Sequence, residues 1–239
     1  MRIVINKEKC VGCGICIDSC PFTAIVMEDE RAYINEYCQL CKACLNICPE
    51  GAIIEIMESG DIQPSVSDTS KYKGVWVFAE QREGKVASVA YELLGAGRRL
   101  ADELNTWLSA VLFGSTESEA HEIIKWGADK VYHCPDRVFD RFNDEPYAEL
   151  LSRLANIHKP EIILAGATAI GRSFFPRVAA KLRTGLTADC TALEIDKETG
   201  NLLQIRPAFG GNIMATILCP NHRPQMATVR PRVMKRGEY

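Results

Sequence analysis

Residues 10–21, CVGCGICIDSCP, carry four cysteines in the spacing Cys-x2-Cys-x2-Cys-x3-Cys-Pro. Residues 38–49, CQLCKACLNICP, repeat that spacing at an offset of 28 residues. The sequence after each run repeats as well, since residues 20–26 read CPFTAIV and residues 48–54 read CPEGAII. Two copies in register indicate an internally duplicated unit with a pseudo-two-fold axis.

The spacing suits an iron–sulfur cluster. Three thiolates separated by two residues each can wrap one tight loop around a corner of an iron–sulfur cube, whereas the fourth begins the next segment and points the other way. Pro21 and Pro49 end the two runs and direct the chain into short apolar strands. Zinc is one alternative, but the doubled cysteine run does not fit the four-ligand coordination of a zinc ion. A disulfide-stapled secreted module is another, and residues 1–7 lack the apolar region of a signal peptide.

Residues 1 to about 58 resemble a bacterial two-cluster ferredoxin, in which the fourth cysteine of each run binds the cluster of the other run. The resemblance implies an α+β ferredoxin-like module with two [4Fe–4S] clusters. The ligands of the first cluster are then Cys10, Cys13, Cys16 and Cys48. The ligands of the second are Cys38, Cys41, Cys44 and Cys20. Because a module of this size has a small apolar core, we expect it to need its cofactors in order to fold.

The composition describes a globular chain. Of 239 residues, 47% are hydrophobic and 25% charged, which suggests one or two domains and excludes disorder. The net charge of −3 gives no general attraction to nucleic acid. Residues 1–60 carry five basic against nine acidic side chains, so we expect this module to bind basic surfaces of redox partners. The apolar stretches are too short to span a bilayer, and we expect a cytoplasmic protein without membrane insertion.

Residues 59–72 are polar and rich in turn-forming residues, and we interpret them as a linker. In residues 73–239, short apolar runs alternate with helix-length amphipathic segments, which predicts an α/β domain with a mostly parallel sheet. The predicted strands are residues 74–79, 107–113, 130–133 and 162–165, and the predicted helices are residues 86–105, 119–126, 147–158 and 172–183. Residues 186–195 and 202–207 predict a hairpin. With further strands at residues 213–218 and 225–229, we expect the sheet to end antiparallel.

Two segments of this domain are candidates for ligand binding. Gly166–Arg172 lies between a predicted strand and helix, where open α/β sheets bind ligands, but it matches no phosphate-loop motif, so a tight packing turn is favoured. Residues 206–212, RPAFGGN, place an arginine beside an aromatic side chain and two glycines, which fits either the edge of a flavin or a turn between strands. The four histidines are scattered. The remaining cysteines, which we interpret as buried small hydrophobic residues, are Cys134, Cys190 and Cys219.

Residues 166–193, 206–216 and 224–234 are similar to the α subunit of electron transfer flavoproteins. The resemblance implies that residues 73–239 are the first domain of that subunit, which pairs with a β subunit of similar fold. In the family a second α domain, which binds FAD, follows this one. We therefore expect FAD in the assembled complex, not on this chain alone. Arg206 is expected to reach the isoalloxazine of a flavin held mainly by the β subunit.

Anaerobic members of that family with an N-terminal ferredoxin module work in flavin-based electron bifurcation. The resemblance implies an electron-transport subunit without catalytic residues of its own. Electrons would pass between ferredoxin, the chain's own clusters and flavin, toward an acyl-CoA dehydrogenase-like or lactate-dehydrogenase-like flavoprotein. One alternative is a cluster-bearing interaction module. Another is a nucleotide-activating enzyme of the α-hydrolase type, which needs a Ser-Gly-Gly-x-Asp-Ser-like loop where residues 79–84 read AEQREG.

Overall fold

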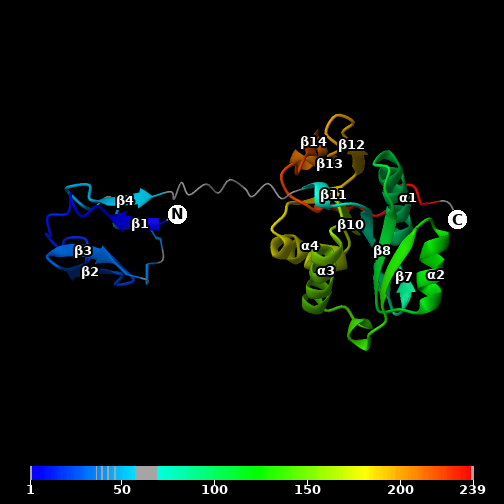
Figure 1. The fold of residues 1–239 in the computed structure, drawn as a ribbon, viewed down its shortest axis with the longest axis horizontal. Coiled ribbons are helices and arrows are strands. Elements are labelled where there is room, and N and C mark those ends of the chain that lie inside the picture. Colours follow the sequence, from blue (N-terminus) through cyan, green and yellow to red (C-terminus); the bar gives the residue numbers. More distant parts are fainter. Residues whose placement is uncertain are drawn as a thin grey trace. The chain divides into compact units, whose positions relative to one another are not determined.

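The chain forms two compact units, Met1–Pro64 and Ser65–Tyr239 (Figure 1). The structure is a computed structural model that describes residues 2–35, 37–38, 40–41, 43–45, 47–56 and 69–237, without the side chains of Arg2, Glu55 and Ile56. Of the predicted linker, residues 59–72, only residues 69–72 are among those described, and Thr69–Lys71 forms the short 3-10 helix η1. None of the helices in the described ranges is long and apolar enough to cross a membrane.

The N-terminal unit is built from two antiparallel strand pairs. β1 (Arg2–Ile5) pairs with β4 (Ile53–Ile56), and β2 (Ile25–Glu28) pairs with β3 (Arg31–Ile34). β1 and β2 flank the first cysteine run and β3 and β4 flank the second, so each pair joins the two copies of the repeat. The backbone continues this pattern, because Asn6 N–H donates to Ala52 O and Asn35 N–H donates to Ala24 O. This is the pseudo-two-fold arrangement that the repeat predicts.

The C-terminal unit contains a six-stranded parallel sheet. Its strands are β5 (Val75–Phe78), β8 (Leu108–Phe113), β9 (Lys130–Cys134), β10 (Ile162–Gly166), β11 (Leu186–Cys190) and β15 (Gln225–Val229). Their order in the sheet is β11-β15-β10-β5-β8-β9. The predicted α/β domain with a mostly parallel sheet is thus confirmed. The expected antiparallel end is wrong, because β15 lies between β10 and β11 and runs parallel to both.

Four helices connect these strands: α1 (Ser88–Glu103), α2 (Glu117–Lys125), α3 (Asp144–His158) and α4 (Ala169–Leu182). The last three begin at side-chain caps, because Thr116, Asn143 and Thr168 each accept a hydrogen bond from a backbone N–H of the first turn. The cap at Thr168 starts α4 three residues before the predicted start. Short elements complete the connections: β6 (Gln81–Arg82), β7 (Lys85–Val86) and η2 (Arg137–Phe139).

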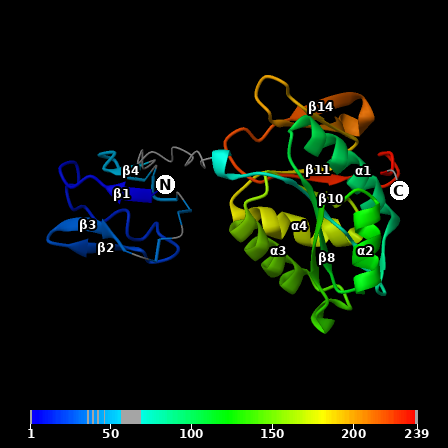
Figure 2. The same ribbon diagram turned by 45° about the vertical axis from the view of Figure 1, so that its right-hand side comes forward.

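Alternation along the buried strands divides the core between the two faces of the sheet. In β8, Leu108, Ala110 and Leu112 pack toward α1 and α2, whereas Val111 and Phe113 pack toward α3 and α4. Figure 2 shows the two helix pairs on opposite sides of the strands. The face under α3 and α4 is rich in aromatic rings, with Phe174 fully buried at its centre.

A second, antiparallel sheet consists of β12 (Ala192–Ile195), β13 (Leu202–Ala208) and β14 (Ile213–Ile217), with the 3-10 turn η3 (Phe209–Gly211) between the last two. The predicted hairpin between residues 186–195 and 202–207 is present as β12 and β13. Its first strand is split, however, because Asp189 is left-handed (φ 62°) and the pairing of β11 shifts register there. Strands β11 and β12 therefore belong to different sheets.

Candidate functional site

A pocket in the N-terminal unit gathers the cysteines that the ferredoxin resemblance assigns to the first cluster. Its lining includes Cys10, Cys13 and Cys16 from the first run and Cys48 from the second. The fourth thiol thus comes from the other copy of the repeat and not from the next cysteine in the sequence.

A second pocket has the complementary set. Its lining includes Cys38, Cys41 and Cys44 from the second run and Cys20 from the first. Among the described residues, no group of three or more His, Cys, Asp or Glu side chains is arranged to hold a metal ion. The thiols of each set instead surround a pocket.

Backbone N–H groups point at several of these sulfurs. Ala24 N–H donates to Cys20 Sγ at 3.3 Å, and at the equivalent place in the other copy Ala52 N–H donates to Cys48 Sγ at 3.3 Å. Ala32 N–H donates to Cys10 Sγ at 3.5 Å. Hydrogen bonds to sulfur tune the potential of an iron–sulfur cluster.

The third cysteine of each run is the most buried. Burial raises the pKa of Cys16, and the neighbouring Cys13 and Cys10 raise it further. Burial likewise raises the pKa of Cys44, beside Cys20. Because a metal takes the thiolate, filling either pocket must release protons. The second cysteine of each run, Cys13 or Cys41, is exposed.

The two cysteine runs differ in their glycines. Gly12 has φ +71°, and a Cβ at this residue would lie 2.1 Å from Glu30 O, so only glycine fits there. Leu40 stands at the equivalent position of the second run and is also left-handed, with φ 55°. The second run therefore carries a side chain where the first has backbone alone.

The segment Gly166–Arg172 forms a tight turn between β10 and α4. A Cβ on Gly171 would lie 1.9 Å from Gly166 O, and one on Gly166 would lie 2.9 Å from Val89 Cγ2. The glycines thus serve close packing of helix and sheet, as the sequence favours. Glu80, only 2% exposed, accepts a hydrogen bond from Thr168 Oγ1. A carboxylate therefore lies beside the N-terminal cap of α4, where a phosphate would otherwise be attracted.

Arg206 lies in β13, paired with Ala215 of β14. Its side chain is partly buried, and no hydrogen bond or ion pair joins it to the rest of the described chain. Just beyond it, Phe209 is 82% exposed, and Gly210 and Gly211 have φ of 71° and 95°. The arginine, the exposed ring and the glycine turn are therefore close in the chain, on a sheet that leaves the charge of Arg206 unpaired.

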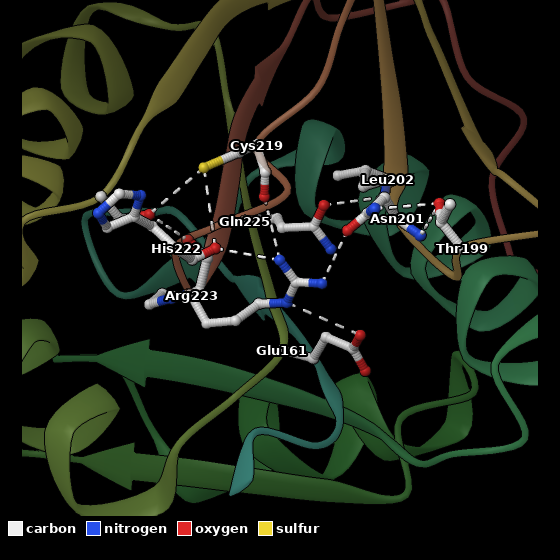
Figure 3. Close-up of polar contacts among 10 residues, drawn as sticks. Glu161, Thr199, Asn201, Leu202, Cys219, His222, Arg223 and Gln225 are labelled. Atoms are coloured by element: carbon white, nitrogen blue, oxygen red, sulfur yellow. Dashed lines mark hydrogen bonds and ion pairs between the residues drawn. The ribbon is translucent and has the colours of Figure 1, made fainter. Parts of the chain in front are cut away.

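Among the buried polar groups of this domain that sequence reasoning missed, two stand out by their contacts. One is Glu80, which comes two residues after β5 and receives bonds from Thr168 and from Arg82. An acidic residue directly after a buried strand was the signal for it. The other is Arg223, which bonds residues of several distant segments (Figure 3). The sequence carries no signal for its partners.

The remaining cysteines differ in their surroundings. Cys190 is fully buried, and burial raises its pKa from 9.0 to about 12. Cys134 and Cys219 are only partly buried, so the interpretation as buried residues is right for Cys190 alone. The histidines lie on different elements: His121, His133, His158 and His222.

The fold and the two pockets define this chain as a protein in which a cysteine-rich module precedes an α/β domain. Comparison with known proteins identifies the families of the two parts. Residues 75–238 match the electron transfer flavoprotein domain, and residues 2–49 match a 4Fe-4S dicluster domain. The electron transfer flavoprotein subunit alpha of Thermoanaerobacterium thermosaccharolyticum is 55% identical over 167 residues, which are 70% of this chain and 50% of that protein. The acryloyl-CoA reductase electron transfer subunit beta of Anaerotignum propionicum is 44% identical over 196 residues, 72% of this chain and 53% of that protein.

A further relative aligns with both units. The lactate dehydrogenase (NAD(+),ferredoxin) subunit LctC of Acetobacterium woodii is 44% identical over 220 residues, 92% of this chain and 51% of that protein. The chain thus spans about half the length of the curated relatives it matches. It belongs to the electron transfer flavoprotein domain family and carries an iron–sulfur domain ahead of that domain.

Proposed function

We propose that this chain is an electron-transfer subunit of a flavin-based, electron-bifurcating complex. In this function, electrons pass between an external ferredoxin, the chain's own two [4Fe–4S] clusters and the flavin of an electron transfer flavoprotein heterodimer. The final partner is an acyl-CoA dehydrogenase-like or lactate-dehydrogenase-like flavoprotein. The observation that carries the proposal is the pair of four-cysteine pockets in a chain whose other unit is an electron transfer flavoprotein domain. The alignment with LctC over both units supports it.

Each pocket offers the four thiols that one [4Fe–4S] cluster requires, which supports two clusters in the chain. Cys10, Cys13, Cys16 and Cys48 would hold the first, and Cys38, Cys41, Cys44 and Cys20 the second. Such a cluster, when bound, supplies one-electron redox chemistry over a wide range of potentials. The protein supplies the thiolates, the N–H donors to sulfur, and apolar walls that limit the access of water. The exposed Cys13 and Cys41 bring each pocket close to the surface, where a redox partner can approach.

The flavin-facing part of the proposal concerns the sheet β12–β14. Arg206 is always charged and unpaired within the described chain, so it can stabilise an anionic flavin presented by a β subunit. Beside it, β14 and its flanks expose large hydrophobic side chains, as a surface for another subunit does. These side chains are Phe209, Ile213, Met214, Ile217 and Leu218.

The test is electron transfer through the assembled complex. The chain is produced anaerobically together with an electron transfer flavoprotein β subunit, and iron, acid-labile sulfide and flavin are measured. We expect about eight iron and eight sulfide per chain. The clusters are then reduced with dithionite, and the absorbance of the flavin is followed. Flavin reduction that depends on the clusters supports the function. Reduced clusters beside a flavin that stays oxidised would instead indicate a cluster-bearing interaction module, and two zinc ions without sulfide would refute the clusters themselves.

A further inference from the structure

The sheet β12–β14 is attached to the parallel sheet at one end by a buried arginine. Arg223 lies in the connection between β14 and β15 and is 7% exposed. Figure 3 shows its guanidinium between the turn of the β12–β13 hairpin and the residues that precede β10 and β15. A buried guanidinium must be hydrogen-bonded or paired, because leaving it unpaired would be costly.

The contacts of Arg223 join three segments. Its Nη1 donates to Cys219 O at 3.0 Å and to His222 O at 3.1 Å, within its own loop. Its Nη2 donates to Asn201 Oδ1 at 2.9 Å, at the hairpin turn. The partner in the third segment is Glu161, directly before β10, whose Oε1 lies 3.9 Å from Arg223 Nε. At that distance Glu161 acts through its charge, since Nε makes no hydrogen bond.

A second buried side chain attaches the same end of the sheet. Gln225, fully buried at the start of β15, accepts a hydrogen bond from Leu202 N–H at 2.9 Å. The inner half of the sheet also packs into the core through Leu193, Ile195 and Leu202. The outer half has no such packing, because Ile213 and Met214 are exposed.

The attachment at this end contributes to the position of Arg206. Arg206 is four residues beyond Leu202 in β13, roughly 13 Å along the strand at the usual rise per residue. A small tilt at the attached end is therefore carried outward to Arg206 and to the exposed face of β14. The contacts that oppose such a tilt include those of Arg223 and Gln225 at this end and, next to Arg206, the hydrogen bond from Thr191 N–H to Ile205 O.

We propose that Arg223 is a positioning residue: it fixes the orientation of the sheet β12–β14 and so the place of Arg206 relative to the flavin of the partner subunit. This inference rests on the proposed function. A lysine cannot replace it, because the ammonium lacks the planar fork that reaches the loop carbonyls and Asn201 together.

The first test needs no cofactor and uses the full chain. Amide hydrogen exchange is measured for Arg223→Met, Arg223→Lys and the control Arg177→Met. The control removes an exposed ion pair between Arg177 of α4 and Asp144 of α3. We expect exchange in residues 202–217 to accelerate about tenfold in both Arg223 variants, with residues 162–166 and the control unchanged. Unchanged exchange in residues 202–217 would overturn the positioning role. If Arg223→Met fails to fold, Asn201→Ala removes the hydrogen bond from Arg223 and one local hydrogen bond to Thr199, and it is expected to accelerate the same peptides.

The second test uses the complex with the β subunit and its flavin. The reduction potential of that flavin is compared for Arg206→Ala, Arg223→Met and the double variant. If Arg223 acts through Arg206, the shift caused by Arg223→Met disappears in the Arg206→Ala background. An equal shift in both backgrounds would refute the inference. An unshifted potential in Arg206→Ala alone would refute the flavin contact in the proposed function, and the exchange result would still decide whether Arg223 fixes the sheet.

Discussion

The two units of this chain are stable for different reasons. The buried core of the N-terminal unit consists, among described residues, of Ile3, Cys16, Ile25, Ala32, Cys44 and Ile53. Two of these six are cysteines assigned to clusters, so the core is partly made of ligands. The C-terminal unit buries large hydrophobic side chains on both faces of a parallel sheet. A unit whose core includes cluster ligands should unfold when the clusters are removed. A unit whose core consists of its own hydrophobic side chains should keep its stability under the same treatment.

The largest expected effect is that of removing iron and sulfide. Treatment with acid or chelator should unfold the N-terminal unit, because its small core does not offset the loss of chain entropy. Strands β1 to β4 should lose their amide protection completely, while the thermal midpoint of the C-terminal unit stays unchanged. Hydrogen exchange and calorimetry on the same sample check this. A cluster-free N-terminal unit that keeps its protection would contradict the comparison.

Losing a single ligand should affect one pocket. Cys20→Ala is expected to damage the cluster held by Cys38, Cys41 and Cys44, and Cys48→Ala the cluster of the first three cysteines. Electron paramagnetic resonance of the reduced chain shows which signal is lost, and Cys134→Ala serves as the control. The crossed assignment is wrong if Cys20→Ala removes the signal that Cys48→Ala was expected to remove.

Within the C-terminal unit, Phe174→Ala should be costly. Phe174 is fully buried and contacts the rings of Phe78, Tyr147 and Phe175. In the Phe174→Ala variant we expect the free energy of unfolding of the C-terminal unit to fall by about 3–5 kcal/mol, while the absorption of the clusters is unaffected. Denaturant unfolding measures this. The matched control, Phe209→Ala, removes an exposed ring and should change stability by less than about 0.5 kcal/mol. Equal losses in the two variants would show that Phe174 is not a core residue.

A smaller effect concerns Cys190 and pH. Its pKa is raised by burial from 9.0 to about 12, so between those values the folded state holds a proton that the unfolded state has lost. The stabilisation is complete below pH 9 and declines as the pH rises toward 12. Relative to Cys190→Ala, the free energy of unfolding of the native protein should fall by about 1 kcal/mol between pH 9 and pH 10. Parallel pH profiles for the two proteins would contradict this.

The last prediction is that the chain alone does not bind a dinucleotide. Glu80 is buried beside the N-terminal cap of α4, where its carboxylate repels a phosphate group. Isothermal titration of the chain with FAD, NAD or AMP should therefore show no binding in the micromolar range. Tight stoichiometric binding of FAD would restore Gly166–Arg172 as a nucleotide site.

The sequence predicts local features of this chain better than long-range ones. The cysteine spacing predicts that the cysteines of each run lie in one tight loop, and the alternation of strands and helices predicts the parallel sheet. The position of β15 is not local, because this strand follows two antiparallel strands and then returns between β10 and β11. The partners of Arg223 were equally unpredictable, since Glu161 and Asn201 come next to it only once both sheets have formed.

The pairing of β1 with β4 also has a consequence for the order of events during synthesis. β1 is synthesised well before its partner strand β4, which comes at residues 53–56. The nascent chain must therefore carry an unpaired strand and the four thiols of the first run, Cys10, Cys13, Cys16 and Cys20, until the second copy of the repeat has been made. With the proposed crossed ligands, neither copy of the repeat can complete its cluster before the other copy has been made. Insertion of iron and sulfide into either pocket would then wait for the whole repeat.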